Sequence, residues 1–105
     1  MYTVVQTPLF DKMVQTLLNQ DEQDDLAVLL ANNPEIGDVI PQSGGCRKVR
    51  YQVNGKGKRG GSRVIYFNRL QNGKIYLLLI YTKAKTENIP AHILKQIKTE
   101  IEKWL

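Results

Sequence analysis

Residues 64–81 have the sequence VIYFNRLQNGKIYLLLIY, two apolar segments joined by a turn signal. Gln71-Asn72-Gly73 is typical of a tight hairpin, because asparagine and glycine adopt the left-handed backbone conformations that such turns need. Both segments are apolar at odd and even positions alike, as in strands that are buried on two faces. The pattern predicts an antiparallel hairpin at the centre of a sheet covered on both sides.

The preceding segment, residues 46–53, has the alternation of a half-exposed strand. Lys48 and Arg50 lie on one side, and the apolar residues at 49, 51 and 53 lie on the other. Arg47 falls on the apolar side, at the beginning of the strand. This segment is therefore predicted to pair beside the hairpin and to present two cations from one face.

Helical patterns and a further short strand flank the three strands. Tyr2–Gln6 is β-branched and predicts a strand, and Thr7-Pro8 then gives an N-cap with proline at the first helical position. The predicted helical features are the apolar stripe Leu9, Phe10, Met13, Val14, Leu17 and Leu18, a second helix from about Asp21 to Asn32, and a last helix opened by Pro90 with the stripe Ile93, Ile97, Ile101 and Trp104. The order β-α-α-β-β-β-α predicts an α+β fold with a central, mainly antiparallel sheet and helices packed on it.

Length and composition narrow the class of protein. A chain of 105 residues with 42% hydrophobic and 24% charged residues fits one globular domain spanning 1–105. The longest apolar run, residues 75–81, is far shorter than the ~18 residues of a membrane helix, and no secretory signal follows Met1. Cys46 is the single cysteine, which fits a reducing compartment. We therefore expect a cytoplasmic protein without a membrane partner.

Charge is distributed very unevenly. Residues 1–38 carry one cation and seven anions, whereas residues 39–86 carry eleven cations and no anion. A block of one sign over strand-forming sequence favours a polyanionic partner, nucleic acid first. The acidic residues near Asp21 are explained by the preference for negative charge at a helix N-terminus.

The segment GKGKRGGS, residues 55–62, resembles a dinucleotide fingerprint, but a strand follows it instead of a helix. It is predicted to be a glycine-rich hairpin loop that brings Lys56, Lys58 and Arg59 to phosphates. One histidine, His92, and one cysteine supply neither a zinc site nor a histidine pair, and the basic block has no carboxylate for a two-metal site. No metal or other cofactor is expected, so any catalysis would fall to lysine, arginine and tyrosine.

Three segments together resemble the HigB branch of the RelE toxin superfamily: GGCRKVR (44–50), GKGKRGGSRVIY (55–66), and Tyr81-Thr82-Lys83 before a terminal helix. Asn33-Pro34 followed by residues 37–40 is also similar, so that the likeness covers about residues 24–105. Members of that family are toxins of type II toxin–antitoxin pairs, which cleave mRNA in the ribosomal decoding site without a metal. An antitoxin encoded beside them silences them.

The resemblance implies roles for particular residues. Arg63 matches the arginine that stabilises the cleaved phosphate, and Lys83 matches the cation that ends the last strand. Residues 47–50 match the cationic strand of the family, and which of their three cations faces RNA is left open. A tyrosine follows the last strand in many members, whereas here none lies beyond Tyr81, so the general base is left open among Lys83, Lys56 and Lys58.

The sequence thus predicts an endoribonuclease in which a ribose 2′-hydroxyl attacks its own 3′-phosphate. The predicted catalytic residues are Arg63, Lys83, Lys56 and Lys58, and the predicted RNA-binding residues are Arg47, Lys48, Arg50, Arg59 and Lys85. The expected partners are mRNA on the ribosome and a cognate antitoxin, a HigA-like helix-turn-helix protein. The alternatives are a non-catalytic RNA- or ribosome-binding module and a toxin-like fold that serves only protein assembly.

Overall fold

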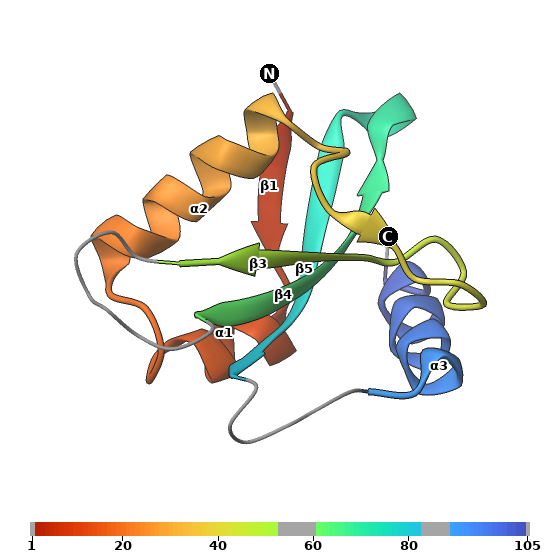
Figure 1. Cartoon of the computed structure of the whole chain (residues 1–105). Helices are drawn as coiled ribbons and strands as arrows, with labels where there is room; N and C mark the ends of the chain where they lie inside the picture. The colour runs from red at the N-terminus through yellow and green to blue at the C-terminus, as the bar shows by residue number, and fades with distance from the viewer. Residues whose placement is uncertain (1, 53–60, 83–88, 105) are drawn as a thin grey trace.

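The computed structural model describes residues 2–52, 61–82 and 89–104. It contains three α-helices and one five-stranded sheet within these residues (Figure 1). The elements in chain order are β1 (Thr3–Gln6), α1 (Pro8–Val14), α2 (Gln20–Asn32), β2 (Asp38–Val39), β3 (Arg47–Tyr51), β4 (Ser62–Arg69), the short 3₁₀ helix η1 (Leu70–Asn72), β5 (Lys74–Thr82) and α3 (Ala91–Glu102). The predicted α+β order is confirmed, with β2 and η1 as additions.

The sheet has the strand order β1-β5-β4-β3-β2. β1 pairs with β5 in parallel, and the other three pairings are antiparallel. The predicted hairpin of β4 and β5 lies at the centre, and its turn ends at Gly73, whose φ of 70° suits a residue without a side chain. The two segments that are apolar on both parities therefore became the central strands.

Each face of the β4–β5 hairpin has its own core. On one face, Val64, Tyr66 and Ile80 pack with residues of α1 and α2 such as Phe10 and Leu26. On the other face, a second set packs with α3: Ile65, Phe67, Tyr76, Leu78, Leu79, Tyr81 and Leu94. The prediction of central strands covered on both sides is confirmed.

Local signals explain where the first two helices begin. The Thr7 side chain accepts a hydrogen bond from the backbone N–H of Phe10 (3.4 Å), and Pro8 occupies the first turn of α1. Asn19 and Glu22 form a reciprocal capping box at the N-terminus of α2, with distances of 2.8 and 2.9 Å. These caps satisfy backbone donors that the first helical turn leaves without partners.

Three details of the expected helices were wrong. α1 ends at Val14, so Leu17 and Leu18 lie beyond the helix, although both still pack in the core that contains Phe10 and Val14. Leu94 is the buried anchor of α3, at 1% exposure, whereas Trp104 follows the helix and is 82% exposed. The expected apolar stripe included Trp104 because its spacing from Ile101 and Ile97 fits a helix, but the helix ends two residues before Trp104.

Among the described residues, no helix has the length and apolar character to cross a membrane.

A register shift in the β4–β5 pairing changes which side chains share a face. Ile65 pairs with Leu79 and Tyr66 pairs with Leu77, so Leu78 is an extra residue in β5. Because side chains alternate along a strand, an extra residue exchanges the two faces beyond it. Leu78 and Leu79 consequently lie in the same core beside α3. Tyr81 is brought to that face as well.

Candidate RNA-binding site

Arg50, Arg63 and Tyr81 form a row across three strands. Arg50 of β3 pairs with Arg63 of β4, and Arg63 pairs with Tyr81 of β5. Directly opposed residues in antiparallel strands point to the same face, with Cβ atoms about 5 Å apart. Two cations of the predicted site, Arg50 and Arg63, therefore lie next to each other on one face of the sheet.

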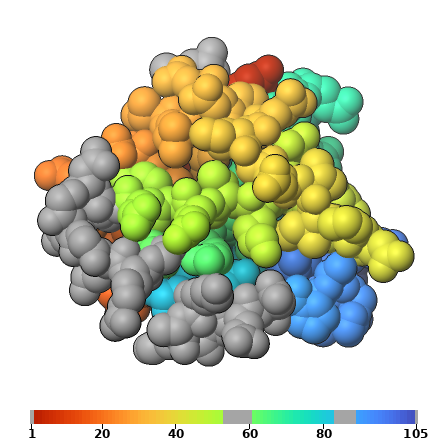
Figure 2. Space-filling model, viewed as in Figure 1, coloured from red at the N-terminus to blue at the C-terminus, as the bar shows by residue number. Residues whose placement is uncertain are grey.

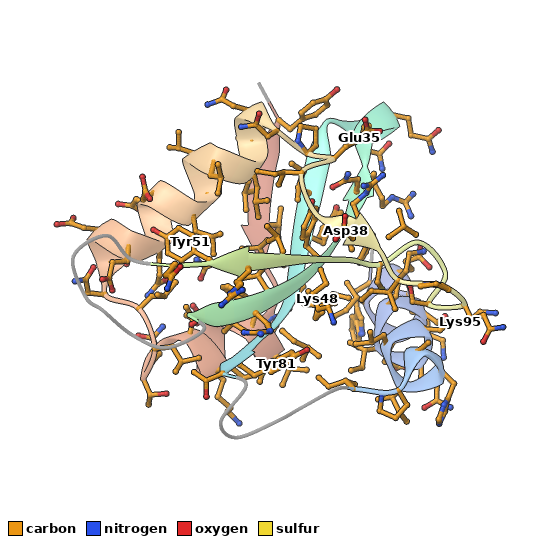
Figure 3. All side chains as sticks on the ribbon, viewed as in Figure 1. Glu35, Asp38, Lys48, Tyr51, Tyr81 and Lys95 are labelled. Carbon is orange, nitrogen blue, oxygen red and sulfur yellow. The ribbon has the colours of Figure 1, made fainter. Side chains whose placement is uncertain are left out.

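The neighbouring row begins with Lys48, which pairs with Ile65 and through it with Leu79. Lys48, Arg50 and Arg63 thus lie on one face of the sheet, beside the apolar surface that α3 covers. In Figure 3, Lys48 and Tyr81 both lie on the α3 side of β3, whereas Tyr51 lies on the α2 side. Figure 2 shows β3 crossing the middle of the molecule, with atoms of β4 and β5 visible between β3 and α3. Arg50, Arg63 and Tyr81 of the first row and Lys48 of the neighbouring row are together called the cationic row.

Tyr81 is buried but its hydroxyl has no bonding partner within the described residues. The side chain is 6% exposed and belongs to the core beneath α3. Burial raises the pKa of the phenol, while the Arg63 charge opposes that rise. The group is therefore protonated at neutral pH and can donate a hydrogen bond.

Arg47 lies on the opposite face and holds a loop. Its guanidinium donates to the carbonyl oxygens of Gly37 (2.7 Å) and Glu35 (3.3 Å), and it lies 4.0 Å from the Glu35 carboxylate. Tyr66, which pairs with Arg47, accepts a hydrogen bond from the Gly37 N–H (2.9 Å) and donates to the Pro34 carbonyl (2.9 Å). Of the three cations in residues 47–50, Lys48 and Arg50 therefore share the face of Arg63.

Two other buried tyrosines use their hydroxyls inside the protein. Tyr51 donates to the Asp25 carboxylate of α2 at 2.7 Å, which joins β3 to that helix. Burial first, and then the Asp25 carboxylate, raise the pKa of Tyr51. Burial also raises the pKa of Tyr66. The hydroxyls of Tyr51 and Tyr66 thus have structural partners on the α1/α2 face, unlike that of Tyr81.

Cys46 and His92 do not join the cationic row. Cys46 is fully buried, and burial raises the pKa of its thiol, as expected for a core residue. His92 is exposed on α3. Within the described parts of the chain, no three histidine, cysteine or carboxylate side chains cluster closely enough to hold a metal ion.

A surface groove of about 550 Å³ lies at the other end of the sheet. Arg47 and Arg69 line it together with Glu35 and Glu102, and Arg69 pairs with Glu102 at 3.4 Å. Two cations and two carboxylates line this groove, so positive charge does not predominate there.

Five of the predicted site residues lie outside the described residues: Lys56, Lys58, Arg59, Lys83 and Lys85. Arg63, Lys48 and Arg50 are described and share one face. The sequence did not predict that Tyr81 shares this face, because it lies in a segment that is apolar on both parities and the extra residue Leu78 has no sequence signal.

No family model matches the chain. Its fold is similar to that of a solved structure of the E. coli toxin RelE, a variant with two arginine-to-alanine substitutions in the free state. The TM-score is 0.62 over 92% of this chain and 96% of that one, with 13% sequence identity. The protein therefore has a RelE-like α+β fold.

Proposed function

We propose that this protein is the toxin of a type II toxin–antitoxin pair and that it cleaves mRNA on the ribosome. The observation that carries the proposal is the cationic row, in which three cations from β3 and β4 share one face of a RelE-like sheet. The sequence resemblance to the HigB branch supports it independently, because its specific segments, 44–50 and 55–66, include these cations. A cytoplasmic location follows from this proposal.

The proposed reaction needs charge stabilisation and two proton transfers. The ribose 2′-oxygen attacks the adjacent phosphorus while the bond to the 5′-oxygen breaks, leaving a 2′,3′-cyclic phosphate and a free 5′-hydroxyl. Arg63 binds the phosphate oxygens through a bidentate contact as negative charge builds on them. Lys83, Lys56 or Lys58 takes the proton from the 2′-hydroxyl and returns one to the leaving oxygen.

RNA is held by cations around this centre. Lys48 and Arg50 contact backbone phosphates from β3, with Arg59 and Lys85 adding contacts from sequence flanking the strands. A role for Arg47 in RNA binding stays a prediction. In the structure its guanidinium donates hydrogen bonds to two loop carbonyls. The proposed reaction uses no metal ion, because residues 39–86 contain no carboxylate to bind one.

A cognate antitoxin completes the proposed system. A basic face of this kind attracts an acidic partner segment, and a HigA-like helix-turn-helix protein is the partner that the resemblance implies. Covering the cationic row would block RNA directly. The gene beside this one should therefore encode a small protein whose co-expression restores growth.

The deciding experiment is cleavage of a defined message on purified ribosomes, with mapping of the cut site and of both product ends. A cut in the decoding site with a cyclic phosphate and a 5′-hydroxyl supports the proposal. Ribosome binding with intact message would instead support the alternative, a non-catalytic binding module. Loss of binding at ordinary salt would favour a role in protein assembly alone.

A further inference from the structure

We propose that the Tyr81 hydroxyl donates a hydrogen bond to the same RNA phosphate that Arg63 binds. This inference rests on the proposed function and adds a phosphate ligand to that site. Tyr81 would be a binding residue that takes no proton from the ribose.

The first argument is the register. Tyr81 pairs directly with Arg63, which in turn pairs with Arg50, so an anion bound to the arginines lies beside the phenol ring. The extra residue Leu78 is what brings Tyr81 to this face. β-Bulges are frequent beside active sites, where they redirect a side chain. Without the extra residue, Tyr81 would point to the face that α1 and α2 cover.

The second argument is the state of the hydroxyl. Tyr51 and Tyr66 are buried to a similar degree, and their hydroxyls bond to the protein at 2.7 and 2.9 Å. The Tyr81 hydroxyl has no such partner among the described residues, and its phenol lies close enough to Arg63 for that charge to act on its pKa. A phenol placed next to a guanidinium can donate a hydrogen bond to an anion that the guanidinium binds.

The third argument concerns which role the phenol can fill. A general base must lose its proton near the working pH. Burial raises the pKa of Tyr81 above its usual value of 10.0, although the Arg63 charge limits the rise. At neutral pH the group therefore keeps its proton, which suits a hydrogen-bond donor and not a base.

The experiment compares Tyr81→Phe with the matched control Tyr76→Phe. Tyr76 lies on the same strand, is 5% exposed and stacks on Phe67 with ring centroids 5.1 Å apart. Both substitutions remove one hydroxyl and keep the ring, so thermal unfolding of both variants should match the parent. The probe is a programmed ribosome whose message carries 2′-deoxynucleotides across the exposed codon, which binds the protein but cannot be cleaved.

We expect Tyr81→Phe to weaken binding of this probe about tenfold, or about 1.4 kcal/mol, as for loss of a hydrogen bond to a charged group. On cleavable message its rate should fall at every pH from 6 to 9, with an unchanged profile shape. Tyr76→Phe should match the parent in both measurements.

Two results would overturn the inference while leaving the proposed function intact. One is binding and cleavage by Tyr81→Phe at parental levels. The other is parental binding of the deoxy probe with a cleavage loss that varies with pH, which would assign Tyr81 to proton transfer. Failure of the proposed function would appear in the parent itself, as ribosomes bound without cleavage or not bound at all.

Discussion

The two faces of β3 differ in what their side chains do, although they alternate along five consecutive residues. On one face, Val49 and Tyr51 pack against the α1/α2 core, and Arg47 hydrogen-bonds a loop. On the other face, Lys48 and Arg50 lie beside the α3 core, where they pair with Ile65 and Arg63 of β4. The first set stabilises the fold, and the second set places two cations on the face that Arg63 shares.

The difference between the faces shows where a small protein can place function. α1 and α2 bring a continuous apolar surface to one face, and the tyrosine hydroxyls there bond within the protein, as in the pair Tyr51 and Asp25. α3 brings Leu94 to one part of the other face, and the cationic row lies beside it. Substitutions on the first face should therefore change stability, and substitutions in the cationic row should change activity.

The largest effect should come from Arg63→Ala. Loss of the guanidinium should remove about 3 kcal/mol or more of transition-state stabilisation, a hundredfold or greater fall in cleavage rate. Single-turnover cleavage on ribosomes and growth on induction would measure it. Thermal unfolding should stay near that of the parent, because Arg63 lies outside both cores.

Arg69→Ala is the matched control for Arg63→Ala, because it removes the same side chain from the same strand. Arg69 lies at the far end of β4 and pairs with Glu102 at 3.4 Å. This variant should cleave at the parental rate. Equal losses in the two variants would mean that general positive charge, and not position in the cationic row, supports activity.

Tyr66→Phe should give the opposite result, lower stability with activity retained. The fully buried hydroxyl accepts from the Gly37 N–H and donates to Pro34, so its loss leaves a buried donor without a partner. The cost is about 2 kcal/mol in the free energy of unfolding. Chemical denaturation measures it, and unchanged stability would mean that the loop is not held by this contact.

The raised pKa of Tyr51 should make the stability of the protein depend on pH in the alkaline range. Its pKa is raised in the folded protein, so above pH ~10 the unfolded chain loses a proton that the folded chain keeps. The free energy of unfolding should then fall as pH rises, by up to about 1.4 kcal/mol per pH unit for this group. Tyr51→Phe, about 1 kcal/mol less stable at pH 8, should approach the parent above pH 10. A constant gap between the two proteins across this range would contradict the argument.

Sequence pattern predicted four of the five strands and most helix positions, and it missed the short strand β2. Residues 64–81 are apolar on both parities because both faces of the central hairpin are covered, and Lys48 and Arg50 alternate because one face of β3 is charged. The parallel pairing of β1 with β5 had no such signal. It depends on the path of the whole chain and not on local pattern.

The candidate site was predictable only in part. The family resemblance indicated Arg63. The position of Tyr81 on the same face required knowledge of the extra residue Leu78, which changes the face without changing composition. Spacing alone was also misleading at Trp104, because apolar residues keep the helical period in the sequence beyond the residue at which the helix ends. Where chain geometry departs from the ideal repeat, sequence pattern assigns the wrong face.

The smallest effect should come from Trp104→Ala. Trp104 follows α3 and is 82% exposed, so its removal takes little apolar surface out of the core, and the free energy of unfolding should change by no more than about 0.5 kcal/mol. Leu94→Ala, at the 1% exposed anchor of the same helix, should cost about 2–5 kcal/mol because it leaves a cavity beside Cys46 and Ile65. Denaturant unfolding of the two variants measures both values. A large fall in the free energy of unfolding for Trp104→Ala would mean that this residue packs in the α3 core, as its spacing predicted.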